Sequence, residues 1–128
     1  MKKGGILHPD LSSLVARLGH TDFIVLADRG YPIPKDVERI NVGLTDNLPT
    51  IPQVMSVLLT EMIIDRIIVT HEMEDISPIR LNEFKEAYPD ILVEFVSHLE
   101  MKELTKEAKA VVKTGDTVPY ANVIIVSG

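Results

Sequence analysis

The sequence predicts a single α/β domain in which helices cover a mostly parallel β-sheet. Short, continuous apolar runs alternate along the chain with segments in which apolar residues recur at helical spacing. The apolar runs suit strands that are covered on both faces, as they are in parallel sheets. The chain has 128 residues, which fits one compact domain over residues 1–128. This alternation is typical of α/β layer folds but does not define the strand order.

The first predicted element is a short amphipathic helix over residues 10–18. Leu11, Leu14 and Leu18 recur at helical spacing and form its apolar face. We expect Asp10 to cap the beginning of the helix and Gly19 to provide a left-handed residue at its end.

The remaining elements follow from the same two patterns. Apolar runs bounded by turn residues predict strands, and the stripe that begins at Ile51, with Pro52 in the first turn, predicts the clearest helix. In chain order we expect a strand at 23–27, a proline-rich loop at 28–34, a short strand around 39–42, a helix over 51–62, a strand at 67–70, a weaker helix at 77–87, a strand at 91–97, a helix over about 100–108, and strands at 110–113 and 123–126.

Composition and charge exclude several classes of protein. The chain has 13 Lys and Arg against 19 Asp and Glu, and this acidic balance argues against nucleic acid as the main partner. It has no cysteine, which excludes disulfides, thiolate metal sites and a cysteine nucleophile. No apolar stretch approaches the roughly 20 residues that span a bilayer, and Pro9 and Asp10 interrupt the first segment before it resembles a signal peptide. We therefore expect a soluble cytoplasmic protein without membrane contact.

Polar residues follow several predicted strands, where open α/β sheets bind their ligands. Asp28, His71, Glu72 and His98 each come at the end of an apolar run, and histidines beside carboxylates can exchange protons near neutral pH. Each also has a simpler interpretation. Asp28 suits a turn, His98 suits a helix start without chemistry, and His71 and Glu72 suit a solvated strand end, which is the interpretation we favour for that pair.

His20 has no functional signal from its position alone. It follows Gly19 at a predicted helix end, where a histidine commonly hydrogen-bonds only to the last carbonyls. His8, before Pro9, suits an ordinary loop. The four histidines lie far apart, and neither a metal-binding His-x-x-x-His spacing nor a glycine-rich phosphate loop occurs. The motifs therefore predict no metal and no nucleotide cofactor.

Four segments together resemble the RbsD / FucU family of sugar mutarotases, which has a ribose branch and a fucose branch. They are residues 1–4, 18–22, 28–34 and 114–122. The likeness runs in order from the first residue to about 126, and it implies a three-layer α/β/α sandwich with a mixed, mostly parallel sheet. A Pro-x-Pro after the Asp-x-Gly turn and a Pro-Tyr-Ala-Asn near the end favour the ribose branch. The fucose branch tends towards Asp-Ala-His and Lys-Tyr-Gly-Asn at those places.

The resemblance also implies site residues and a reaction. His20 would be the catalytic acid, while Asp28, His98 and the Tyr120-Ala121-Asn122 segment would contact the sugar. The implied reaction is isomerisation of D-ribose between its β-pyranose and β-furanose forms, by acid–base ring opening and reclosure without a cofactor. Family members are ring-shaped homo-oligomers, often decamers, with the sugar site close to a subunit boundary.

The chain departs from the family pattern at several positions. Arg29 stands where a small residue is usual, and His71-Glu72 stands where a Glu-Glu pair is common. Lys113 and Asp116 replace the usual Arg and Glu. Two alternatives to the ribose activity remain open at this point: a fucose-type mutarotase that exchanges anomers, and a non-catalytic sugar-binding protein that assists transport.

Overall fold

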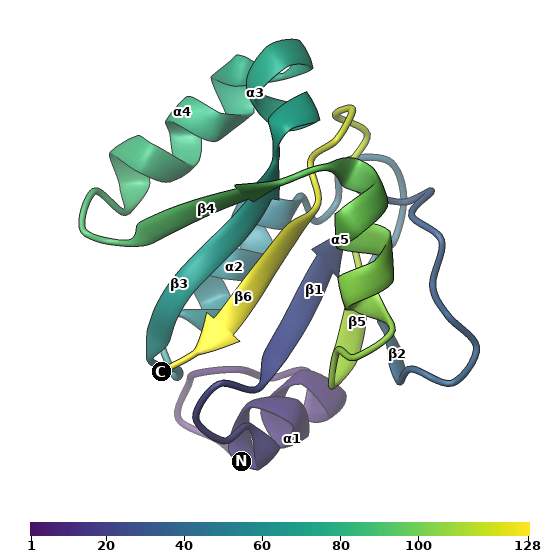
Figure 1. The fold of residues 1–128 in the computed structure, drawn as a ribbon. Helices are drawn as coiled ribbons and strands as arrows, with labels where there is room; N and C mark the ends of the chain where they lie inside the picture. Colours follow the sequence, from purple (N-terminus) through teal and green to yellow (C-terminus); the bar gives the residue numbers. More distant parts are fainter.

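A six-stranded sheet forms the centre of the computed structural model, which describes residues 1–128 (Figure 1). The strands lie in the order β2-β5-β1-β6-β3-β4. Their bounds are β1 Phe23–Ala27, β2 Arg39–Asn41, β3 Ile64–Thr70, β4 Leu92–Val96, β5 Ala110–Lys113 and β6 Val123–Ser127. Strand β6 pairs antiparallel with β1 and β3, whereas all other neighbours pair parallel. The sheet is therefore mixed and mostly parallel, as predicted, with one reversed strand near its middle.

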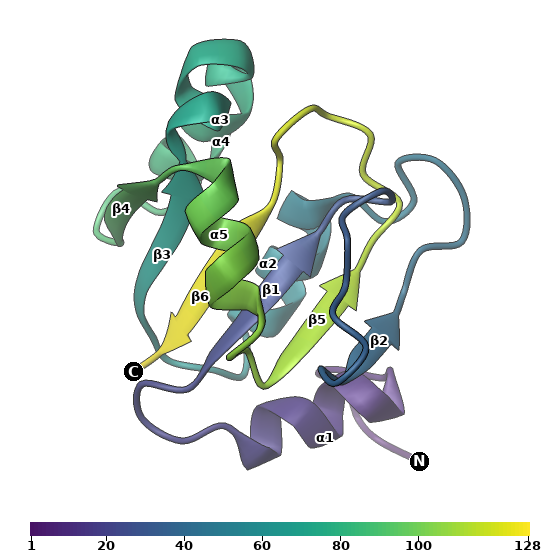
Figure 2. The ribbon, with the colours of Figure 1, turned by 45° about the vertical axis from the view of Figure 1, so that its right-hand side comes forward.

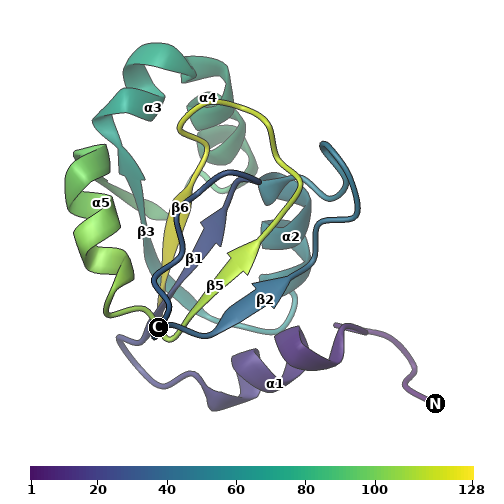
Figure 3. The same cartoon turned by 90° about the vertical axis from the view of Figure 1, so that its right-hand side faces the viewer.

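Helices cover both faces of this sheet and produce three layers. Figure 3 shows α5 on one side of the strands and α2 on the other. Their bounds are α1 Pro9–Arg17, α2 Ile51–Leu58, α3 His71–Ile76, α4 Pro78–Ala87 and α5 His98–Thr105. None of these helices combines the length and the apolar character that crossing a membrane requires. The α/β/α class expected from the sequence is confirmed.

Alternate residues of each strand enter two separate cores, because successive side chains of a strand point to opposite faces. Ile24 and Leu26 of β1 pack in the larger core with α1, α2 and α4. Val25 and Ala27 pack in the smaller core, together with Tyr31 and Met101. The loop that joins β1 to β2 runs down this second face beside α5 (Figure 2). That loop therefore serves as part of the outer layer.

The ends of α1 differ from the prediction. Nδ1 of His8, rather than Asp10, caps the helix by accepting the Leu11 N–H at 3.4 Å. Pro9 explains the shift, because it suits the first helical position, where no N–H partner is needed. Gly19 is also not left-handed: the helix ends in extended backbone at Leu18, and the left-handed residue is Thr21, with φ of 69°. The prediction for Gly19 is therefore wrong.

One helix was not expected from the sequence. Thr70 Oγ1 accepts the Met73 N–H at 3.0 Å and thereby begins α3 immediately after β3. His71 and Glu72 are its first residues, so their interpretation as a solvated strand end is wrong. The Glu72 carboxylate instead accepts the backbone N–H of His98 at 2.9 Å. This bond joins the beginnings of α3 and α5.

Candidate active site

Most of the residues expected at the sugar meet at the carboxyl edge of the sheet. Asp28 follows β1, His98 begins α5 one residue after β4, and Tyr120 and Asn122 precede β6. Because β6 runs in the reverse direction, its beginning lies at the edge where its neighbours end. A cavity of about 340 Å³ opens there, lined by Asp28, Gly30, Tyr31, Pro32, His98, Lys102, Pro119, Tyr120 and Asn122.

Asp28 and Asn122 are locked together across the strand ends. The Asp28 N–H donates to Asn122 Oδ1 at 2.8 Å, and Asp28 Oδ1 accepts the Gly30 N–H at 2.9 Å. The other carboxylate oxygen of Asp28 and the amide nitrogen of Asn122 have no partner within the chain. The pair therefore presents one acceptor and one donor group at the cavity, which is the hydrogen-bonding pattern that a polyhydroxylated ligand needs.

The His98 imidazole lies between two aromatic side chains. The edge-to-face contacts with Tyr31 and Tyr120 have centroid distances of 6.0 and 5.1 Å. Its Nδ1 is buried without a hydrogen-bond partner in the chain. Burial, and then the positive charge of Lys102, lower the pKa of His98 below 6.5, against weaker opposite effects of Glu72 and Asp28. The ring is therefore neutral at pH 7 and can accept a hydrogen bond or a proton.

Tyr31 and Lys102 line the cavity and were not identified from the sequence. The Tyr31 hydroxyl hydrogen-bonds with Thr105 Oγ1 at 2.8 Å. Burial raises the pKa of Tyr31 above 10, so this side chain lines the cavity as an uncharged group. Lys102 lies one helical turn after His98 on α5. The (i, i+4) spacing could have indicated it, had the helix been expected to begin at residue 98 rather than at about 100.

His20 lies at the opposite edge of the sheet from Asp28. It belongs to the tight turn before β1, whereas Asp28 follows the same strand, and five strand residues span about 16 Å. In this turn the Gly19 N–H donates to the Asp22 carboxylate at 2.8 Å. The His20 side chain is exposed and makes no hydrogen bond within the chain. A single copy of the chain therefore does not bring His20 to the cavity.

The other residues considered from the sequence also have definite places. The Ala121 side chain is fully buried in the core and does not line the cavity. Arg29 forms an exposed ion pair with Asp46 at 2.8 Å and lines a different cavity. The exposed His71 ring stacks on Phe95 at a centroid distance of 5.7 Å. No three His, Asp or Glu side chains are arranged to hold a metal ion.

A buried ion pair holds the loop that leads to Tyr120. Asp116 is fully buried, and its Oδ2 accepts from Arg80 Nη1 at 2.6 Å and from the Ile51 N–H at 2.9 Å. Its Oδ1 accepts the Val118 N–H at 3.0 Å. The loop is thereby tied to the beginnings of α2 and α4. This anchoring supports the left-handed backbone of Tyr120, whose φ is 55°, and fixes one wall of the cavity.

Comparisons with known proteins agree with this arrangement. The model of the RbsD / FucU transport protein family matches residues 1–128. A D-ribose pyranase of Geobacillus thermodenitrificans is 42% identical over 128 residues, covering 100% of this chain and 97% of the relative. The Bacillus subtilis RbsD structure complexed with D-ribose has a TM-score of 0.95 at 40% identity, covering 100% of this chain and 98% of that one. A fucose mutarotase of Streptococcus pneumoniae in complex with L-fucose has a TM-score of 0.74 at 26% identity, covering 95% and 93%.

Proposed function

This chain belongs to the RbsD / FucU transport protein family, and we propose that it is a D-ribose pyranase, an isomerase that interconverts the β-pyranose and β-furanose forms of D-ribose. One observation carries this proposal. A cavity lined by Asp28, His98, Tyr120 and Asn122 stands in a fold that matches a D-ribose complex with a TM-score of 0.95. The fucose relative is more distant in both sequence and structure, so the ribose activity is favoured over fucose anomer exchange.

The reaction needs only proton transfers. A proton is delivered to the ring oxygen while another is removed from the anomeric hydroxyl, so that the bond from the anomeric carbon to the ring oxygen breaks and the open aldehyde forms. The open-chain sugar then rotates about its carbon–carbon bond, and a different hydroxyl closes the ring through the reverse proton transfers. Because the uncatalysed reaction already proceeds in water, acid–base help of about 10²–10⁴-fold for each group gives a useful enzyme.

The side chains at the cavity suit particular parts of this reaction. Asp28 orients a sugar hydroxyl through its free carboxylate oxygen, and Tyr120 and Asn122 hold other hydroxyls. The segment that contains Ala121 contributes its backbone, because the Ala121 side chain is in the core. Neutral His98 lines the cavity between Tyr31 and Tyr120 and contacts the sugar through its ring. Delivery of the proton to the ring oxygen is the role of His20.

We place His20 at the cavity of a neighbouring copy. Within one chain it lies at the far edge of the sheet, exposed and without a hydrogen bond, so a second copy must bring it to Asp28. Large apolar side chains flank both halves of the proposed contact. Ile63, whose carbonyl accepts the Gly128 N–H at the His20 edge, is 77% exposed, and Leu99, next to His98, is 72% exposed. Exposed apolar side chains at both edges favour self-association.

The proposed assembly is a ring-shaped homo-oligomer, a decamer. In it, the end of the sheet that carries His20 meets the end that carries the cavity of the next copy. Light scattering coupled to size exclusion measures its mass, and a monomer at micromolar concentration would contradict the shared site.

We also propose that residues 1–128 act as one catalytic domain in the cytoplasm. Fractionation of cells that express the chain, with antibody detection, tests the compartment.

Saturation-transfer NMR on D-ribose tests the activity. We expect the enzyme to accelerate exchange between the β-pyranose and β-furanose signals, and the Asp28→Ala variant to lose this acceleration. Asp36→Ala is the matched control, since Asp36 is exposed in the same loop and its side chain has no hydrogen bond. Faster anomer exchange of L-fucose without an effect on ribose ring size would indicate the fucose activity. Ribose binding with unchanged exchange would indicate a non-catalytic transport accessory.

A further inference from the structure

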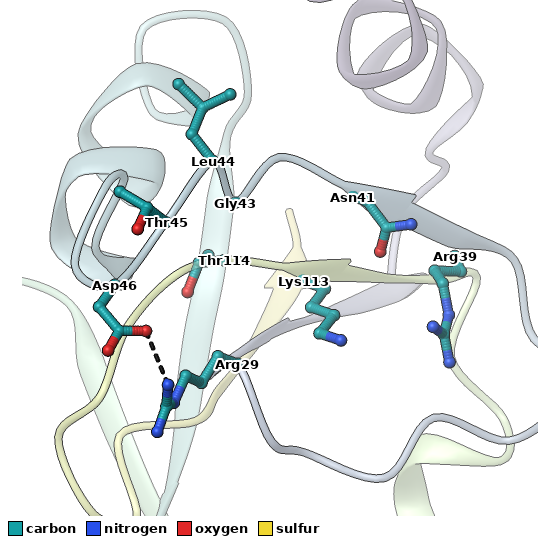
Figure 4. Close-up of a pocket in the computed structure, with 9 residues that line it drawn as sticks. All are labelled: Arg29, Arg39, Asn41, Gly43, Leu44, Thr45, Asp46, Lys113 and Thr114. Atoms are coloured by element: carbon teal, nitrogen blue, oxygen red, sulfur yellow. Dashed lines mark hydrogen bonds and ion pairs between the residues drawn. The ribbon is translucent and has the colours of Figure 1, made fainter.

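We propose that this chain has a second ligand site, which binds the phosphate group of a small anion, at the corner of the sheet where β2 and β5 end. A cavity of about 270 Å³ lies there, lined by Arg29, Arg39, Asn41, Gly43, Leu44, Thr45, Asp46, Lys113 and Thr114 (Figure 4). Eight of these nine residues are not hydrophobic. The proposal does not depend on the ribose activity, since no lining residue is shared with the cavity at Asp28.

The strand register explains why cationic side chains meet at this corner. Arg39 and Asn41 are alternate residues of β2 and therefore share a face of the sheet. Asn41 pairs with Lys113 of β5, and Lys113 also pairs with Ala27 of β1, two residues before Arg29. Figure 4 shows the Lys113 side chain between those of Arg29 and Arg39, with the Asn41 amide beside it. Two strands, β2 and β5, and the loop that follows β1 thus contribute to one polar hollow.

The charges of this hollow are not balanced within the chain. The side chains of Arg39 and Lys113 have neither a hydrogen bond nor an ion pair, although Lys113 is half-buried. The one carboxylate of the wall, Asp46, already pairs with Arg29 at 2.8 Å. Three cations thus face one anion, in a chain whose formal net charge is -6. Cations that face one concave space repel each other, and a bound anion relieves that repulsion.

A phosphate group fits this hollow better than a carboxylate does. A phosphomonoester carries close to two negative charges at pH 7, which matches the excess of two positive charges on the wall. Guanidinium groups bind phosphate oxygens through paired hydrogen bonds, and Lys113 adds a compact charge between them. Arg29, which stands where the family usually has a small residue, is one of the three cations, so this departure has a use at the site.

Titration of the whole protein at low ionic strength tests the proposal. Inorganic phosphate and glycerol 3-phosphate are the two probes, and the backbone amide NMR signals of Arg39, Asn41 and Lys113 report binding. Saturable shifts of these signals by either probe support the site, and the tighter probe distinguishes free phosphate from a phosphomonoester. No saturable shift by either probe would overturn the proposal.

Variants separate a site from general attraction to a positive surface. We expect Arg39→Gln with Lys113→Gln to weaken binding of the tighter probe by about tenfold or more, since charge-assisted bonds to phosphate are strong. Lys106→Gln removes a positive charge from an exposed pair with Glu103 and is the matched control, expected to change affinity less than twofold. If the double variant does not fold, Arg39→Gln alone is the second variant, because Arg39 is exposed and lies on an edge strand. Equal weakening by the control would refute the site.

Discussion

Replacement of Asp116 by Asn should destabilise the fold by about 3 kcal/mol, although the new side chain has nearly the same size and shape. Asp116 is fully buried and Arg80 is 8% exposed, so the guanidinium cannot regain water when its partner loses charge. Breaking a buried pair from one side costs about 3–5 kcal/mol. We take the lower end because Arg80 Nε also lies 3.3 Å from Glu83. The new amide oxygen can also still accept the backbone N–H of Val118 or of Ile51.

Thermal unfolding followed by circular dichroism measures this effect. For a chain of this length, about 3 kcal/mol corresponds to a fall in Tm of roughly 10–15 °C. Glu38→Gln is the matched control, because it breaks the exposed pair with Arg17 and should cost about 0–1 kcal/mol.

A second variant separates the ion pair from general damage to the loop. Adding Arg80→Met to Asp116→Asn removes the unpaired buried charge, so part of the lost stability should return. We also expect the KM for ribose to rise in Asp116→Asn, because the loop that carries Tyr120 loses its anchor. A change in Tm no larger than that of Glu38→Gln would refute the reasoning about this pair.

Three further predictions follow from single contacts. Lys102→Gln should raise the pKa of His98 towards 6.5, measured by NMR titration of the imidazole, because Lys102 is one of the two causes that lower it. The pKa of His98 in the folded state lies below its unfolded value, so His98 contributes stability above pH 6.5 that is lost as the pH falls through the lowered pKa. A pKa of His98 at or above 6.5 in the wild-type protein would contradict this. Thr50→Ala removes the capping box at the beginning of α2 and should cost about 1 kcal/mol in urea unfolding, and no change would contradict the cap. Gly115→Ala places a methyl group against the backbone of the 45–48 turn and should cost about 1–3 kcal/mol, whereas Gly4→Ala, in open space, should cost far less.

The sequence predicted the layers of the fold because strand and helix periodicity is a local property. Runs such as 23–27 and 110–113 appear in the structure with the expected bounds. The reversal of β6 and the strand order depend on contacts between distant segments, which periodicity does not contain. Helix α3 was missed for a different reason: it has only six residues, which follow the cap at Thr70, and fewer than two turns leave no apolar stripe.

Part of the candidate site was accessible from the sequence. Strand ends pointed to Asp28 and His98, and the resemblance to the family added Tyr120 and Asn122; the structure gathers all four at one cavity. The contacts that hold these residues in place could not be predicted from the sequence. For example, the hydrogen bond from the His98 N–H to the Glu72 carboxylate joins residues 26 positions apart. The role predicted for His20 remains a prediction, because it needs a contact between two copies of the chain.

The most direct test of the shared sugar site is pyranose–furanose exchange in a mixed oligomer. His20→Ala and Asp28→Ala chains are purified separately, each assayed for ribose ring exchange by saturation-transfer NMR, and then dissociated and assembled together at equal amounts. We predict that each variant alone is inactive and that the mixture recovers about a quarter of the wild-type acceleration, since random pairing restores that share of sites in a symmetric assembly. A mixture with no more activity than its components, or a fully active His20→Ala variant, would contradict the account.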